Sequence, residues 1–357
     1  MTLRLLLLMT LFGWAGDLLA ESFWRSLKNW VDSADIADCD TTYLHLPRQG
    51  FIGHANVYFT GTLAHINYDQ EHTNQGTLNV SGNLRTRMAT LLSAGVSYRG
   101  WGLSLSKDFS RHGDTEMAFS SYGQAYGLEL RLHNSYSMSG TLDVSEAGSE
   151  SLWDIDVDDF HQRTFLGNFY YCFNHKRFSL PAAMSHTIIQ KRSSGSWLAI
   201  LNYWHATSYI DDERQSFIIA EEVLDEGLMG TARYRKLSQT QVSVGGGYAY
   251  NWIFGEGHCL LHLSAMPMLS VWHRNRSYYD IEISSVSMQE PQVFRYADAI
   301  GQKLAINGTV HAGLVYNFSR YVTGVTAFAN LDSFPDKENF SLYTFDWSSR
   351  FFFGVRF

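Results

Sequence analysis

Segment 341–357, at the end of the chain, alternates between apolar and polar positions. Successive side chains of a β-strand point to opposite faces, so one face of this segment would be an aromatic wall and the other would carry charge. The first face consists of Tyr343, Phe345, Trp347, Ser349, Phe351, Phe353, Val355 and Phe357. This pattern is typical of a strand with lipid on one side and a wet interior on the other.

The same alternation predicts hairpins elsewhere in the chain. Across a turn with an even number of residues, the apolar positions must switch between odd and even residue numbers. The reason is that the residue numbers of two paired positions then add up to an odd number. Such switches occur at 99–100, 254–257, 319–320 and 174–177. The last of these predicts a strand that starts at Phe178 and places Leu180, Ala182, Met184 and Ile188 on one face.

Further strands are predicted near 55–68, 120–138, 196–209 and 216–224. The predicted fold is all-β, a transmembrane antiparallel β-barrel of about twelve to fourteen strands, an even number being usual in bacterial barrels. Fourteen is preferred because it places every short turn at one end. A soluble β-sandwich remains the alternative, but it would also have to explain the aromatic face of segment 341–357.

The connections are predicted to differ at the two ends of the barrel. If the C-terminus lies in the periplasm, the short turns share its side, and the longer connections face the medium. The short turns are 99–100, 210–213, 254–257 and 319–320. The longer connections are 69–84, 139–163, 274–303 and 332–340.

The other end of the chain has the pattern of an export signal. Residues 1–20 contain Arg4, an apolar run from Leu5 to Trp14, and Ala20 before Glu21, which predicts cleavage after Ala20. Residues 21–50 are predicted to be a short periplasmic extension, and residues 51–357 to form the barrel domain. We therefore expect an outer-membrane protein of a Gram-negative bacterium.

Composition agrees with a barrel. Mean hydropathy is −0.17 although aromatic residues make up 15% of the chain, as expected when apolar and polar faces alternate between aromatic girdles. A net charge of −8 argues against nucleic acid as a partner. Cys39, Cys172 and Cys259 have no metal-ligand spacing, and we expect no cofactor and no metal.

Three segments carry a family resemblance. They are Phe169-Tyr-Tyr-Cys-Phe-Asn-His-Lys-Arg-Phe-Ser-Leu-Pro-Ala-Ala183, Ile189-Gln-Lys-Arg-Ser-Ser-Gly-Ser196 and Asp40-Thr-Thr-Tyr43. Together they resemble a Bacteroidota family known only as domain of unknown function four-four-two-one, from about Asp40 to Phe357. The resemblance implies an exported, barrel-like protein and supplies no activity, substrate or catalytic residue.

Few motifs suggest bond chemistry. Asn174-His175 and Ser179, with His186 nearby, contain the residue types of a serine hydrolase, but a polar turn explains them as well. Asp154-Ile-Asp-Val-Asp-Asp159 has the carboxylate spacing of a calcium loop, yet position 159 is not Gly and Phe165 stands where Glu is needed. The catalytic residues are therefore unknown, and the sequence favours a protein that is not an enzyme.

Charges on the inward face are the remaining candidate site. Glu129, Arg131 and His133 alternate with leucines, and Asp346 and Arg350 alternate with aromatic residues, so all five are predicted to face the lumen. Arg85 and Arg87 are predicted to do the same. Such charges set pore selectivity, bind a solute, or form an ion-pair network that fills a narrow barrel.

These patterns leave three functions open. The first is a passive channel or binder of a small solute or lipid. The second is a barrel enzyme that modifies lipid or surface polymer, and the third is a structural or adhesive protein acting through its outer loops. We expect contact with outer-membrane lipid, and recognition by the barrel-assembly machinery at Phe353, Val355 and Phe357.

Overall fold

The described part of the chain is almost entirely antiparallel β-structure. A computed structural model describes residues 39–47, 50–72, 76–109, 113–146, 149–210, 218–225, 228–285, 292–300, 304–335 and 340–357. The predicted signal peptide, and most of the predicted extension after it, lie outside these residues. No helix in the described ranges is long and apolar enough to cross a membrane.

The elements follow one another with short connections. They are β1 (Leu44–His45), β2 (Phe51–His72), β3 (Gly76–Thr86), β4 (Ala89–Tyr98), β5 (Trp101–Asp108), β6 (Thr115–Tyr122), β7 (Tyr126–Glu146), β8 (Ser149–Cys172), α3 (Leu180–Met184), β9 (Ile189–Gln190), β10 (Ser194–Ile210), β11 (Ile218–Asp225), β12 (Leu228–Phe254), β13 (Cys259–Ser285), β14 (Gln292–Ile300), β15 (Ala305–Phe318), β16 (Tyr321–Pro335) and β17 (Phe340–Arg356).

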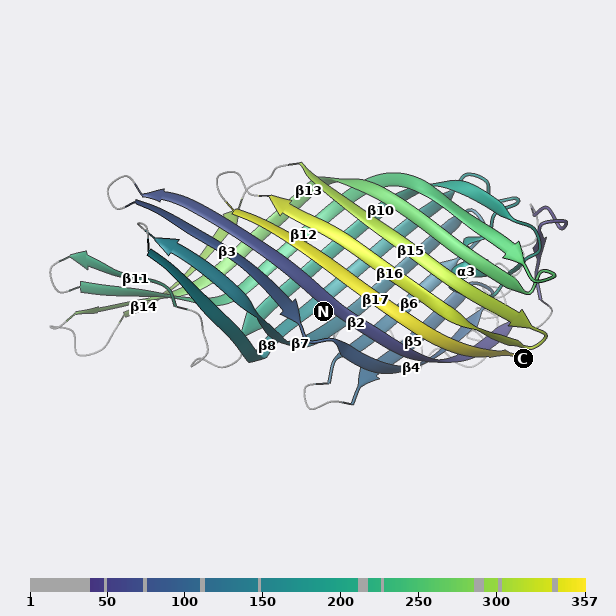
Figure 1. Cartoon of the computed structure of the whole chain (residues 1–357), viewed down its shortest axis with the longest axis horizontal. Coiled ribbons are helices and arrows are strands. Elements are labelled where there is room, and N and C mark those ends of the chain that lie inside the picture. Colours follow the sequence, from purple (N-terminus) through teal and green to yellow (C-terminus); the bar gives the residue numbers. More distant parts are fainter. Residues whose placement is uncertain are drawn as a thin grey trace, which may run out of the picture.

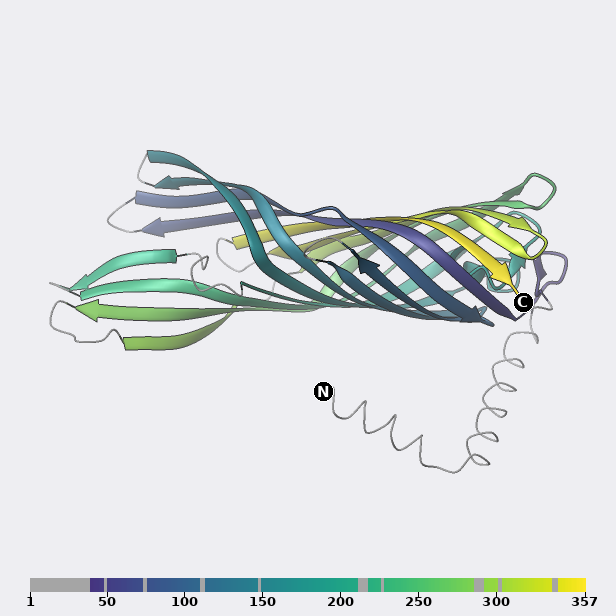
Figure 2. The same cartoon turned by 90° about the horizontal axis from the view of Figure 1, so that it is seen from below.

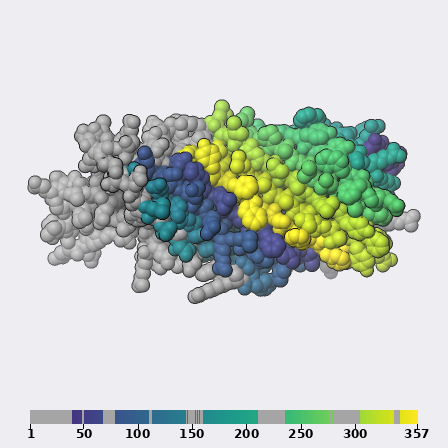
Figure 3. Space-filling view, viewed as in Figure 1, coloured from purple at the N-terminus to yellow at the C-terminus, as the bar shows by residue number. Residues whose placement is uncertain are grey.

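The strands close into a barrel. In ring order they are β2, β4, β5, β6, β7, β8, β10, β12, β13, β15, β16 and β17, so the described residues form a ring of twelve. β17 closes the ring on β2 with Trp347 opposite Gly61, and Figure 3 shows β17, in yellow, beside the purple segment that contains β2. The all-β barrel is therefore confirmed, with the lower of the predicted strand numbers rather than the preferred fourteen.

Three of the four predicted hairpin turns are present at one end of the barrel. They join β4 to β5, β12 to β13 and β15 to β16. Arg99 and Gly100 have φ values of 48° and 91°, so both adopt the left-handed conformation that a two-residue hairpin turn needs. The C-terminus lies at this same end (Figure 1), which we call the turn end.

The fourth predicted hairpin is wrong. After the turn at 174–177 the chain forms the short helix α3 and the two-residue strand β9 instead of a wall strand. The turn at 210–213 is predicted at the turn end, and its residues 211–213 lie outside the described ranges. β10 starts beside Asn251 near the turn end and still pairs at Tyr209 with Lys236, so Ile210 lies at the opposite end.

The four connections predicted as long outer loops consist mostly of strand. For example, β7 and β8 continue as one hairpin to Glu146 and Ser149, across most of the range 139–163. β2 is 22 residues long, and β12 and β13 are 27 residues each, whereas a membrane crossing needs about 9–11. The strands therefore project well beyond a bilayer, in two groups that Figure 2 separates clearly.

One part of the wall is discontinuous. β3 and β4 follow each other along β2, with Arg87-Met88 between them. β3 pairs on its other edge with β7, whereas β4 pairs with β5. Farther from the turn end, β3 thus takes the place of β4, β5 and β6. The register of β7 shifts here between Tyr136 and Met138, and Ser137 has a φ of 65°.

Side chains alternate between an apolar outside and a mixed inside. On β17 the outward face includes Phe351 and Phe353, which are more than half exposed, whereas inward-facing Phe352 and Arg356 are buried. β15 shows the same alternation along its length, with Leu304, just before it, and Ile306 exposed. The predicted aromatic wall is present, and its opposite face contains an aromatic ring as well as charges.

Candidate functional site

The connection between β8 and β10, residues 173–193, folds into the turn end of the barrel as a plug. Ser179 caps helix α3 by accepting a hydrogen bond from the backbone N–H of Ala182 at 3.1 Å, and Pro181 fits the first helical turn, where no N–H is needed. The apolar side chains of the plug then pack on the inner faces of the wall strands. Leu180 joins one apolar cluster, and Ala182 and Ala183 join another that contains Phe352.

Polar contacts fix the plug to the wall. Arg356 is only 1% exposed and donates hydrogen bonds to the backbone carbonyl of His186 at 3.1 Å and to Asn317 Oδ1 at 2.6 Å. The ring of His186 stacks on Phe352 with centroids 4.2 Å apart. On the other side, Asn251 donates to the carbonyl of Ser179 at 2.9 Å. The plug is therefore held by several wall strands at once.

A short N-terminal segment covers the plug from outside. β1 pairs with β9, and Asp40 forms an ion pair with Arg177 at 3.4 Å. Arg177 also lies over the ring of Tyr43. The hydroxyl and backbone N–H of Thr42 hydrogen-bond to Asp40 and, with Arg177, hold the pKa of its carboxyl below the ordinary value. We call residues 39–47 the strap.

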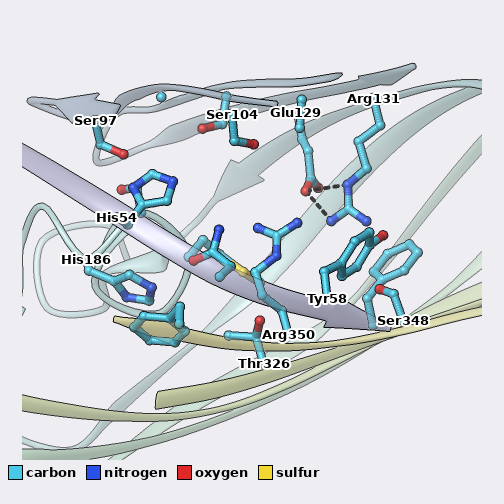
Figure 4. A pocket seen from close by; sticks show the side chains of 18 of the residues that line it. His54, Tyr58, Ser97, Ser104, Glu129, Arg131, His186, Thr326, Ser348 and Arg350 are labelled. Atoms are coloured by element: carbon cyan, nitrogen blue, oxygen red, sulfur yellow. Dashed lines mark hydrogen bonds and ion pairs between the residues drawn. The ribbon is translucent and has the colours of Figure 1, made fainter. Parts of the chain in front are cut away.

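A cavity of about 100 Å³ lies in the barrel beside the plug. One of its walls is made of small residues from three neighbouring strands. These are Ser97, Gly102, Ser104, Ala118 and Ser120. Figure 4 shows His186 of the plug at one side of the cavity and Arg350 extending into it. A water molecule needs about 10–15 Å³ of such space, so the cavity can hold a small solute with water.

Two ion pairs border the cavity. Arg131 donates to Glu129 Oε1 from Nε at 3.1 Å and from Nη2 at 2.6 Å, and the other carboxylate oxygen accepts from Tyr170 at 3.3 Å. Arg350 Nη2 lies 3.6 Å from Glu116 Oε1, and its guanidinium stacks over Tyr58 at 5.0 Å. The first pair is close and hydrogen-bonded, whereas the second is loose.

The cluster continues away from the plug. Glu116 accepts a hydrogen bond from Tyr58 at 2.9 Å and lies 3.7 Å from His133. His133 is also 3.7 Å from Asp114, which immediately precedes β6. Asp346 accepts from Thr62 at 2.5 Å. The structure thus brings five of the charged candidates to the ring interior, with Glu129, Arg131 and Arg350 at the cavity and His133 and Asp346 beyond it.

Three residues of this cluster are not predicted from the sequence, and two arginines predicted to face the lumen do not. Tyr58, Asp114 and Glu116 are not predicted as lumen residues, although Asp114 and Glu116 are alternate residues of a segment whose opposite face contains Met117. Arg85 and Arg87, predicted to face the lumen, are exposed. The break at Arg87-Met88 reverses the alternation, so that β3 buries even positions and β4 buries odd ones.

The residues considered as hydrolase candidates make contacts that stabilise the local structure. The Ser179 hydroxyl caps α3, and His175 Nδ1 lies 3.3 Å from the carbonyl of Cys172. The acidic segment 154–159 is not a loop but part of β8, where Asp154 and Asp156 pair with Thr141 and Ser139. Among the described residues no group of three or more His, Cys, Asp or Glu side chains could hold a metal ion.

These features define the protein as a β-barrel with an internal plug and a charged cavity beside it. The chain belongs to the family described as Domain of unknown function (DUF4421), which matches residues 38–357. No curated protein sequence matches the chain.

Solved structures with some similarity include outer-membrane proteins. The β-domain of the Bordetella autotransporter BrkA is 10% identical with a TM-score of 0.33, and the match covers 85% of this chain and 100% of that one. The outer-membrane protease OmpT from Escherichia coli is 9% identical with a TM-score of 0.36, covering 87% and 97%. The CymD monoaromatic hydrocarbon channel is 8% identical with a TM-score of 0.20, covering 87% and 89%.

Proposed function

We propose that this protein is an outer-membrane barrel that binds a small solute in its internal cavity and is closed to free diffusion by its own plug. The observation that carries the proposal is the cavity of about 100 Å³ between the small-residue wall of β4, β5 and β6 and residues Met184, Ser185 and His186 of the plug. An interior filled only for stability would place larger side chains on that wall.

The outer surface supports a location in a bilayer. Large apolar side chains are exposed on every part of the ring, including Leu105, Trp197, Leu269, Leu314 and Phe353. A monomeric soluble protein rarely exposes a continuous apolar surface of this kind, whereas a membrane barrel presents an apolar band to lipid.

The interior argues against an open, porin-like lumen. Apolar clusters that include Phe178, Leu180 and Phe352 close the turn end. Farther along, Trp204 and Phe334 pack together in a further buried cluster, with ring centroids 5.0 Å apart. A solute held between these layers would lie in a partly enclosed space, where polar contacts are stronger than in bulk water.

Cysteine labelling tests this proposal. Ser104→Cys would be placed in a background where the native cysteines are replaced, and probed with a small neutral methanethiosulfonate and with a maleimide carrying a polyethylene glycol chain. The same cysteine would be tested in a plug-shortened variant, in which a short Gly/Ser turn replaces residues 175–193. Asn174 Nδ2 lies 2.8 Å from the Gly195 carbonyl, so the two ends of that turn are already adjacent.

We expect the small reagent to label Ser104→Cys in the intact barrel and the bulky one to label it only after plug shortening. Ser319→Cys, at an exposed turn, is the control that both reagents should label in both backgrounds. Rapid labelling of the intact barrel by the bulky reagent would show an open pore. Failure of the small reagent would show a sealed interior without a solute site.

A further inference from the structure

Among the described residues, some of the polar groups around the cavity have hydrogen-bond partners and others do not. Glu129 is the carboxylate that lines the cavity, and both of its oxygens are engaged, one by Arg131 and the other by Tyr170. A positively charged solute would therefore have to displace one of these contacts. Among the described lining residues the acceptor left without a partner is the neutral amide oxygen of Asn56, so no free carboxylate is available to a cation.

Arg350, in contrast to Glu129, has a hydrogen-bond donor without a described partner. Its Nε is buried and has no hydrogen-bond partner within the described ranges. The nearby carboxylate oxygen, Glu116 Oε1, is 3.6 Å from Nη2, beyond hydrogen-bond distance, and Tyr58 and His133 contact the other oxygen of Glu116. In Figure 4 the guanidinium extends into the pocket between Tyr58 and His54. A buried donor without an acceptor is costly, and a guanidinium donor is best satisfied by a carboxylate or phosphate.

Other groups at the cavity can donate alongside Arg350. His186 Nδ1 and His311 Nε2 are buried and without a partner in the described part of the chain, and a neutral imidazole donates from one of its nitrogens. Ser97, Ser104 and Ser120 line the small-residue wall and each can turn a hydroxyl proton inward. Donors thus surround the space on more than one side.

We propose that the cavity binds a small oxyanion, such as a simple carboxylate or inorganic phosphate, on the guanidinium of Arg350. The proposal rests on the solute-binding function above and names its ligand class. The oxyanion accepts hydrogen bonds from Arg350 and further hydrogen bonds from the imidazoles and serine hydroxyls. The Arg131–Glu129 pair stays intact beside it. The size of the cavity limits the ligand to a few heavy atoms plus water.

Equilibrium dialysis of the refolded full barrel in detergent tests the proposal. The probes are radiolabelled inorganic phosphate, acetate and, as a neutral compound of similar size, glycerol. Arg350→Met removes the donor, and Ala118→Leu fills the cavity while leaving every charge in place. Arg320→Met removes one charge at an exposed turn that is not part of the cavity lining and is the matched control. Heat-modifiable mobility confirms that each variant has folded.

We expect phosphate or acetate to bind to the wild type and to the Arg320→Met variant. Loss of one charge-assisted hydrogen bond should weaken this binding about tenfold or more in Arg350→Met, and Ala118→Leu should abolish it. Glycerol should not compete. Arg350→Lys keeps the charge but lacks the planar fork, so it should bind with intermediate affinity.

The outcomes separate this inference from the proposed function. Glycerol binding that Ala118→Leu blocks, without anion binding, would overturn the oxyanion class and leave the solute-binding barrel standing. Anion binding unchanged in both cavity variants would place the anion elsewhere and overturn the inference. Binding of none of the probes would overturn the inference, and the labelling of Ser104→Cys would then decide whether a solute site exists at all.

Discussion

The ion pair between Glu129 and Arg131 allows a quantitative prediction for barrel stability. Two N–H···O contacts of 3.1 and 2.6 Å join the side chains, which are only 10% and 15% exposed. At an effective dielectric constant of about 20, unit charges about 3 Å apart attract by roughly 5 kcal/mol. Much of this offsets desolvation, but removing one partner leaves a charge buried and unpaired, which costs about 3–5 kcal/mol.

The assay is urea unfolding of the protein in short-chain lipid vesicles, followed by tryptophan fluorescence. Glu129→Gln and Arg131→Met should each lower the free energy of unfolding by about 3 kcal/mol or more. The double variant should cost clearly less than the sum, with a coupling energy of about 2 kcal/mol, because neither charge is then left alone. Arg177→Met, in an exposed pair, is the control and should have little effect. Additive single effects would refute the idea that the pair acts as a unit.

Three further predictions concern the plug, the strap and the barrel seam. Arg356→Gln should speed amide hydrogen exchange in α3 about tenfold or more without changing exchange in β7, because the bonds from the guanidinium to the His186 carbonyl and Asn317 are lost; unchanged α3 exchange would contradict this anchoring role. Since the pKa of Asp40 is lowered in the folded state, docking of the strap should be full above the ordinary value of 3.8 and weaken as pH falls below it; hydrogen exchange of the strap at several pH values checks this, and Asp40→Asn should remove the difference. Phe357→Ala should reduce the folded fraction in heat-modifiability gels, because the Phe357 ring stacks at 6.3 Å on Phe51 of β2; full folding yield would contradict a role in closing the ring.

Much of the wall could be predicted because one physical rule governs it. Lipid on one side and packed side chains on the other force an alternation of period two, and this alternation located the hairpin turns at Arg99-Gly100 and Ser319-Arg320. The same rule predicted the apolar outer face of β17.

The plug could not be recognised from alternation alone. Phe178, Leu180, Ala182 and Ile188 are buried, as in a wall strand, but they are buried inside the barrel. A segment packed inside the barrel buries apolar residues, and here their spacing resembles that of a strand. Pro181 was the available signal, since proline lacks the N–H that a central strand needs and fits the first turn of a helix.

The projecting strands and the details of the cavity were missed for other reasons. Beyond the membrane a strand no longer needs an apolar face, so segment 154–159 of β8 lost the pattern that marks a membrane strand. The pairing of Glu116 with Tyr58 and Arg350 joins strands that are distant in sequence. Only the closure of the ring brings such residues together.

Single-channel recording in planar bilayers tests most directly whether this barrel is closed by its plug. If the plug closes the barrel, the wild type should insert but give no stable conductance steps. The variant in which a Gly/Ser turn replaces residues 175–193 should conduct, with an ion selectivity that changes when Arg131 or Arg350 is reversed in charge. Stable steps from the wild type, equal to those of the plug-shortened variant, would show that the plug does not close the barrel.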